Sequence, residues 1–119
     1  MIQNLEERLI NYNVLILDIV DELPDKKGSN HIVSQVTRAA TVSVMMYGEA
    51  QSSDSRKDFI EKVKLLLKEL RETYNCLKII SRKNYAGPNN EKLRKALNES
   101  HEIISIFAKI TETAIKNSK

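Results

Sequence analysis

The chain has 119 residues, of which 41% are hydrophobic, and its formal net charge is +3 at pH 7. That length and apolar content fit one domain, residues 1–119, and the mild basic excess permits an acidic partner without requiring one. The single cysteine, Cys76, excludes an intramolecular disulfide and a zinc site built from several thiolates, which suits a reducing cytoplasm. Three Gly, two Pro and no Trp leave few turn signals for short strands, so the composition predicts an all-α fold.

The N-terminal residues 1–8 lack the basic start and unbroken apolar run of a signal peptide. No apolar run approaches the ~20 residues that are needed to span a bilayer. We therefore expect a soluble, cytoplasmic protein without a membrane partner.

The first predicted helix covers about residues 3–22. Its apolar residues alternate steps of four and three, which places them in one stripe along a helix. The stripe consists of Leu5, Leu9, Tyr12, Ile16, Ile19 and Leu23. Residues 24–28, Pro-Asp-Lys-Lys-Gly, end this helix.

The second predicted helix runs to about residue 51, and Ser29 or Asn30 is expected to cap its start. Its apolar face is wide and has two adjacent stripes. One contains Ile32, Val36, Ala39, Ser43 and Met46, and the other contains Val33, Ala40, Val44 and Tyr47. We expect this helix to be the most buried. Gly48 lies inside it and costs ~1 kcal/mol relative to Ala, which indicates a close approach of another helix or subunit.

A polar turn at residues 51–55 precedes the third helix, which we expect to be the longest. Its inner stripe consists of Phe59, Val63, Leu66, Leu70, Thr73, Leu77 and Ile80. Residues 84–88 stop it, because Gly87 suits a turn conformation and Pro88 cannot continue a helix.

Asn89 is the expected cap of the fourth helix. The inner face of this helix contains Leu93, Leu97, Ser100, Ile104, Phe107, Thr111 and Ala114, with Ala96, Ile103 and Ile110 beside them. Short loops between long helices favour antiparallel neighbours. The sequence therefore predicts an antiparallel up-and-down four-helix bundle.

A pattern in the second and third helices resembles a known family. It consists of Gln35, Arg38-Ala39-Ala40, Glu49, Lys57-Asp58-Phe59 and Glu72-Thr73. Over roughly residues 24–80 the chain resembles the bacterial four-helix-bundle proteins encoded by intervening sequences of large-subunit ribosomal RNA genes. It departs from the family pattern at three positions. Val42 stands where the family has a Ser, Met46 stands where it has an Asn, and Ala50 stands where it has the Gly that follows the Glu. A polar site that needs that Asn lacks the side chain here.

The resemblance implies an assembly and a ligand. Family members form rings of five identical four-helix bundles. A related branch comprises accessory proteins of diversity-generating retroelements, which bind nucleic acid and a reverse transcriptase. The resemblance thus implies a homopentamer that binds RNA.

Arg38 and Glu49 lie eleven residues apart, about three turns of helix, so they share a side of the helix but cannot pair directly. One interpretation is that Gln35, Arg38 and Glu49 make interhelical or intersubunit polar contacts that fix the register of an apolar interface. The other is that Arg38 faces RNA. Candidate partners of its guanidinium are Glu72 or Glu49 from a neighbour.

The outer face of the third helix is basic. Lys57, Lys64, Arg71 and Lys78 recur every seven residues, and Lys68 and Arg82 lie on the same strip. Carboxylates border one side of the strip, and they are Asp54, Asp58, Glu61, Glu69 and Glu72. The strip is either an ordinary solvated face, whose field these carboxylates offset, or a surface that binds phosphates.

On the other side of the strip, Ile60, Leu67 and Tyr74 widen the apolar face beyond the bundle interior. We expect this flank to be buried against another subunit. With four Tyr, two Phe and no Trp, the chain has few side chains on which bases could stack. Any RNA binding should therefore rest on the phosphate backbone and be weakly sequence-specific.

No residue pattern indicates catalysis, a metal or a cofactor. Neither His31 nor His101 follows a Glu by three residues, so the Glu-x-x-His pattern of di-iron bundles is absent. Gly-rich phosphate loops and nucleophile elbows are also missing. The expected function is non-enzymatic binding of RNA or a nucleoprotein through the basic strip. The alternative is a protein-interaction scaffold without a nucleic acid partner.

Overall fold

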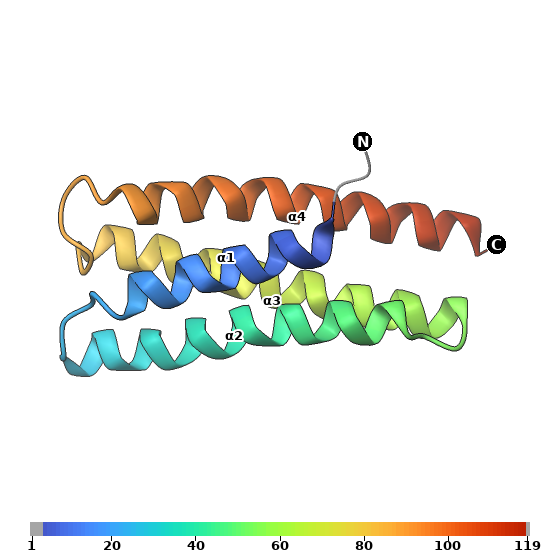
Figure 1. Cartoon of the computed structure of the whole chain (residues 1–119), viewed down its shortest axis with the longest axis horizontal. Helices are drawn as coiled ribbons and strands as arrows, with labels where there is room; N and C mark the ends of the chain where they lie inside the picture. The colour runs from blue at the N-terminus through green and yellow to red at the C-terminus, as the bar shows by residue number, and fades with distance from the viewer. Residues whose placement is uncertain (1–3, 119) are drawn as a thin grey trace.

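The computed structural model describes residues 4–118, which form four α-helices and no strand. The helices are α1 (Leu5–Val20), α2 (Lys27–Gln51), α3 (Arg56–Arg82) and α4 (Glu91–Asn117). Figure 1 shows that the chain reverses direction at each connection, so that helices adjacent in sequence lie side by side. The predicted all-α fold of four helices is confirmed. None of the four has an apolar stretch long enough to cross a bilayer.

Three of the helices begin at a side-chain cap, because a helix leaves its first backbone N–H groups without partners. Asn4 accepts a hydrogen bond from the N–H of Glu7, and Ser55 accepts one from the N–H of Asp58. The cap of α4 is Asn90, and the prediction of Asn89 was wrong by one residue. Asn89 has a φ of 57° and belongs to the turn, where Gly87 has the expected positive φ of 78°.

The predicted start of α2 was also wrong. The helix begins at Lys27, before Ser29 and Asn30, and its first residue follows Lys26, which makes no side-chain cap. Gly28 is therefore helical and does not end the preceding turn. An added Cβ at Gly28 would lie 2.7 Å from the hydroxyl of Tyr85, so glycine lets this side chain approach the helix.

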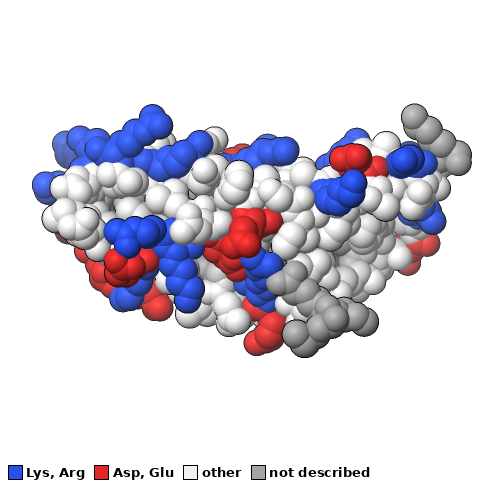
Figure 2. Space-filling view, turned by 90° about the horizontal axis from the view of Figure 1, so that it is seen from above, with Lys and Arg blue, Asp and Glu red and all other residues white. Residues whose placement is uncertain are grey.

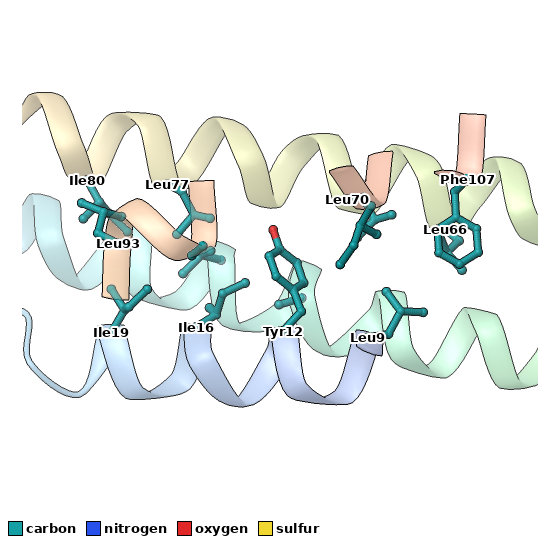
Figure 3. Packing of buried hydrophobic residues seen from close by; sticks show 14 of the residues in the cluster. Leu9, Tyr12, Ile16, Ile19, Leu66, Leu70, Leu77, Ile80, Leu93 and Phe107 are labelled. Carbon is teal, nitrogen blue, oxygen red and sulfur yellow. The ribbon is translucent and has the colours of Figure 1, made fainter. Parts of the chain in front are cut away.

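The core lies between the inner faces of all four helices. Figure 3 shows the stripe of α1, with Leu9, Tyr12, Ile16 and Ile19, pointing towards Leu66, Leu70, Leu77 and Ile80 of α3. These eight side chains are at most 2% exposed. Burying one Leu or Ile side chain contributes about 1.5–3 kcal/mol, so this seam holds α1 on the other helices.

The polar residues of the predicted inner stripes are buried as well, and their hydroxyls have partners. Ser43, Thr73, Ser100 and Thr111 each donate to the carbonyl four residues earlier in the same helix. The hydroxyl of Tyr12 bonds to the Ser100 hydroxyl, which links α1 to α4. Hydrogen bonding removes most of the cost of burying these groups.

The expectation that the second helix is the most buried was wrong. In the described residues α3 has eight buried residues and α2 has six. Val44 and Tyr47 of the second α2 stripe are only half-buried, because α1 has 16 residues against 25 in α2 and covers only part of it (Figure 1). The third helix has 27 residues, and α4 has the same length.

Candidate nucleic-acid and subunit interfaces

The six basic residues of the predicted strip all project from α3. Lys57, Lys64, Lys68, Arg71 and Arg82 are exposed, and Lys78 is half-buried. Residues seven apart on a helix lie about 10.5 Å from each other, so the strip is a straight row of cations. Figure 2 shows Lys and Arg side chains in a row along one long edge of the molecule.

None of these six cations forms an ion pair with another residue in the described part of the chain. Three of the five carboxylates beside the strip are held by other cations. Glu69 and Glu72 bind Arg38, and Asp58 binds Lys62 at 3.0 Å. The strip therefore carries more uncompensated charge than the sequence alone indicates. The ammonium of Lys78 lies 4.4 Å from the centre of the Tyr74 ring.

Arg38 joins α2 to α3 through a two-pronged contact with Glu69. Its Nη1 donates to Oε2 at 3.2 Å and its Nη2 to Oε1 at 3.1 Å, and Nη2 also donates to Glu72 Oε2 at 2.7 Å. Glu72 is one of the expected partners, whereas the sequence did not single out Glu69. Arg38 therefore forms its ion pairs with carboxylates of its own chain, between α2 and α3.

The environment of Glu69 favours its charged form despite burial. Its side chain is 12% exposed, and that burial would raise the pKa of the carboxyl. The hydrogen bonds and positive charge of Arg38, together with Glu72 and the charge of Lys68, outweigh this effect and hold the pKa of Glu69 below its ordinary value. Glu69 is therefore a charged residue whose place in the fold depends on Arg38.

The other predicted interface residues of α2 are exposed. Gln35 and Glu49 make no side-chain hydrogen bond to any other described residue. An added Cβ at Gly48 would meet no described atom within 4 Å. The expectation that another helix of the chain approaches Gly48 closely was wrong, because this glycine faces open space. A subunit contact there stays a prediction.

The apolar flank of α3 borders a groove along α4. Ile60, Leu67 and Tyr74 each line a different hollow, of about 720, 490 and 590 Å³ respectively. The α4 side of the groove is lined by Leu97, His101, Ala108, Ile115 and Asn117. We call this surface the α3/α4 groove. Leu67 is 7% exposed, whereas Ile60 and Tyr74 are half-buried.

Two further titratable residues, Arg8 and Cys76, lie outside these surfaces. Arg8 donates to Glu99 at 2.9 and 2.7 Å and so ties α1 to α4. Burial and the nearby charge of Glu72 raise the pKa of the Cys76 thiol. Residues 4–118 contain no cluster of three His, Cys, Asp or Glu side chains that could hold a metal ion.

These features define the molecule as an all-helical protein of four helices with a basic helix face beside an apolar groove. No family model matches the chain, and no curated protein matches it. It is similar to the crystal structure of a protein of unknown function from the S23 ribosomal protein family of Bacteroides thetaiotaomicron VPI-5482. The two share 26% sequence identity and a TM-score of 0.80, over 91% of this chain and 98% of that chain.

Proposed function

We propose that this chain is a non-enzymatic, homo-oligomeric four-helix-bundle protein that binds RNA, free or in a nucleoprotein, through the basic strip of α3. The observation that carries the proposal is the row of six cations that have no carboxylate partner among residues 4–118, next to carboxylates that other cations hold. We also propose membership of the family encoded by intervening sequences. The match to a protein of the S23 ribosomal protein family supports this relationship, which would make the oligomer a pentamer in the cytoplasm.

Binding through the strip would be driven by the release of counterions from the phosphate backbone. Each phosphate that a Lys or Arg neutralises steepens the dependence of affinity on salt by about 0.7–0.9 in log–log slope. The aromatic residue Tyr74 borders the strip, and Lys78 covers its ring. Base stacking would therefore contribute little, and the binding should discriminate weakly between sequences.

Size-exclusion light scattering with and without a mixed pool of structured RNA tests the proposal. At low salt we expect an oligomer that binds the RNA, and at moderate salt we expect release. The double variant Lys64→Glu/Lys68→Glu should lose binding. The matched control Lys95→Glu/Lys109→Glu makes the same charge change on exposed residues of α4 and should retain most of it. An oligomer that ignores RNA even at low salt would contradict the RNA proposal.

The second candidate is a scaffold that binds another protein and no nucleic acid. The α3/α4 groove favours it, because half-buried apolar side chains line its hollows. Charge reversal on the strip discriminates between the two functions. A scaffold would still capture its partner after Lys68→Glu/Arg82→Glu, which changes two strip residues that line none of the three hollows, whereas an RNA-binding surface would not capture RNA.

A further inference from the structure

A second apolar surface lies on the opposite side of the basic strip from the α3/α4 groove. On α3, Leu65 and Ile79 are 47% and 44% exposed, and on α2, Met45 is 61% exposed. These are three of the five large hydrophobic side chains that are most exposed in residues 4–118. We call this surface the α2-side stripe.

The three residues lie on one face because of helix geometry and the contacts of Arg38. Leu65, Glu69, Glu72 and Ile79 are spaced by four, three and seven residues, so they follow one side of α3. Arg38 binds Glu69 and Glu72, which places that side of α3 against α2. Met45 lies seven residues after Arg38, about two turns further along the same side of α2.

We propose that the α2-side stripe binds the α3/α4 groove of a second copy of this chain, so that copies associate head to tail. The proposal rests on the proposed homo-oligomer and names the two unlike surfaces that form its contact. An unlike pair of surfaces is a heterologous contact, which generates a closed ring or an open filament instead of a twofold dimer.

Shape favours this pairing. Met45, Leu65 and Ile79 project from the surface, whereas the groove consists of three hollows of about 490–720 Å³. A stripe placed on another stripe would leave gaps between projecting side chains, and a groove placed on a groove would leave the hollows empty. A stripe in a groove buries apolar area on both copies.

Charge favours the same pairing. Around the stripe, the carboxylates outnumber the cations and are Glu49, Asp58, Glu69 and Glu72, against Arg38, Lys62 and Lys68. Across the three hollows of the groove, the cations outnumber the carboxylates and are Arg56, Lys57, Lys64, Arg71 and Lys116, against Glu61, Glu102 and Glu112. Surfaces of opposite charge attract, whereas either surface would repel its own copy.

The position of the basic strip has a consequence for the assembly. Leu65 and Leu67 point about 200° apart around α3, and Lys64, Lys68 and Arg71 lie in the outer sector between them. Head-to-tail contacts would therefore cover both flanks of α3, together with Lys57, Lys64 and Arg71, which line the groove, and would leave Lys68 and Arg82 of the strip open.

Two variants and a mixing experiment test the pairing by light scattering without RNA. Met45→Lys/Leu65→Lys places cations on the stripe, where they would face the basic groove. Ala108→Trp fills the hollow that Leu67 and Ile115 line. Each variant alone should have the mass of one chain, 13.6 kDa. An equimolar mixture should have twice that mass, because one intact stripe meets one intact groove while the other two surfaces are blocked.

A matched control replaces two exposed apolar residues elsewhere. Val14 and Leu17 of α1 are 49% and 37% exposed, and Val14→Lys/Leu17→Lys should leave the assembly unchanged. Circular dichroism must show wild-type helix content for every variant, and Met45→Ala/Leu65→Ala replaces Met45→Lys/Leu65→Lys if that stripe variant does not fold.

The outcomes separate this inference from the proposed function. If the wild-type protein assembles and either blocked variant still assembles like it, the pairing is wrong while the oligomer stands. A mixture that stays at the mass of one chain also overturns the pairing. Wild-type protein that is monomeric at all concentrations would overturn the proposed oligomer together with this inference.

Discussion

The inner and outer faces of α3 differ in how completely their groups have partners. On the inner face, Leu66, Leu70 and Leu77 are fully buried, and the Thr73 hydroxyl donates to a carbonyl of its own helix. On the outer face, cations and apolar side chains are left without partners in the described residues. When the side chains of one helix face all have partners within the chain and those of the other face form an exposed apolar and charged surface, that second face is expected to contact another molecule. The comparison assigns stability to the inner face and, under the proposed function, binding to the outer face.

The largest effect should come from the inner face. Leu70→Ala removes a fully buried side chain and leaves a cavity, so we expect the free energy of unfolding to fall by about 2–5 kcal/mol. Denaturant unfolding monitored by circular dichroism measures this. Leu65→Ala is the control on the outer face of the same helix, where the change should stay within about 0.5 kcal/mol. Equal losses at the two positions would contradict the division between the faces.

The Arg38 cluster lies at the border between the faces and should give a smaller effect. Arg38→Ala leaves Glu69 mostly buried without its cation, so we expect a loss of about 1–3 kcal/mol at pH 7. Glu69→Gln/Arg38→Ala is the control, because it also removes the stranded charge and should recover part of the loss.

The pH dependence of this pair has a definite sign. The folded-state pKa of Glu69 lies below the ordinary value of 4.5, so the pair stabilises the fold fully above that pH. As the pH falls from 4.5 through the folded-state pKa, the contribution is lost. The stability difference between wild type and Arg38→Ala should therefore narrow in that range. A difference that stays constant down to pH 2 would show that Arg38 acts through packing alone.

The hydrogen bond between the buried hydroxyls of Tyr12 and Ser100 should contribute still less to the free energy of unfolding. Tyr12→Phe removes the hydroxyl that bonds Ser100, while Ser100 keeps its own bond to the Ala96 carbonyl. We expect a loss of about 1 kcal/mol. Burial raises the pKa of Tyr12 above its ordinary 10.0, so the folded state favours the protonated ring. Stability should therefore fall as the pH rises above 10 in the wild type, and less so in Tyr12→Phe, as measured by thermal unfolding.

The sequence predicted the inner faces well because helical spacing of apolar residues is a long-range and redundant signal. The stripe from Leu9 to Ile19 and the buried hydroxyls of Ser43, Thr73 and Ser100 were all expected. The sequence predicted the helix starts less well. Neighbouring residues are equally good caps, so the pattern does not fix the first helical residue, as at Ser29 and Asn30 or at Asn89 and Asn90.

The candidate site was only partly predictable. The row of cations on α3 follows from spacing within one helix, but its lack of partners does not. Whether Glu69 and Glu72 neutralise that row or bind Arg38 depends on how α2 packs against α3, which is a tertiary property. The α2-side stripe was missed for the same reason. Met45 and Leu65 stand in apolar runs, residues 44–47 and 65–67, on separate helices, and only the packed structure shows that these two residues stay exposed and share a face.

The outer face should have the smallest effect on stability and the clearest effect on binding. Lys64 and Lys68 are exposed and have no ion partner in the described residues, so Lys64→Glu/Lys68→Glu should change the free energy of unfolding by less than about 0.5 kcal/mol. If both lysines contact phosphates, their loss should reduce the log–log salt slope of RNA affinity by about 1.4–1.8. Fluorescence anisotropy titrations at several salt concentrations measure that slope, with Lys95→Glu/Lys109→Glu as the charge-matched control. An equal decrease in both variants would assign the binding to net charge and not to the strip. The division between the two faces of α3 would then hold for stability alone.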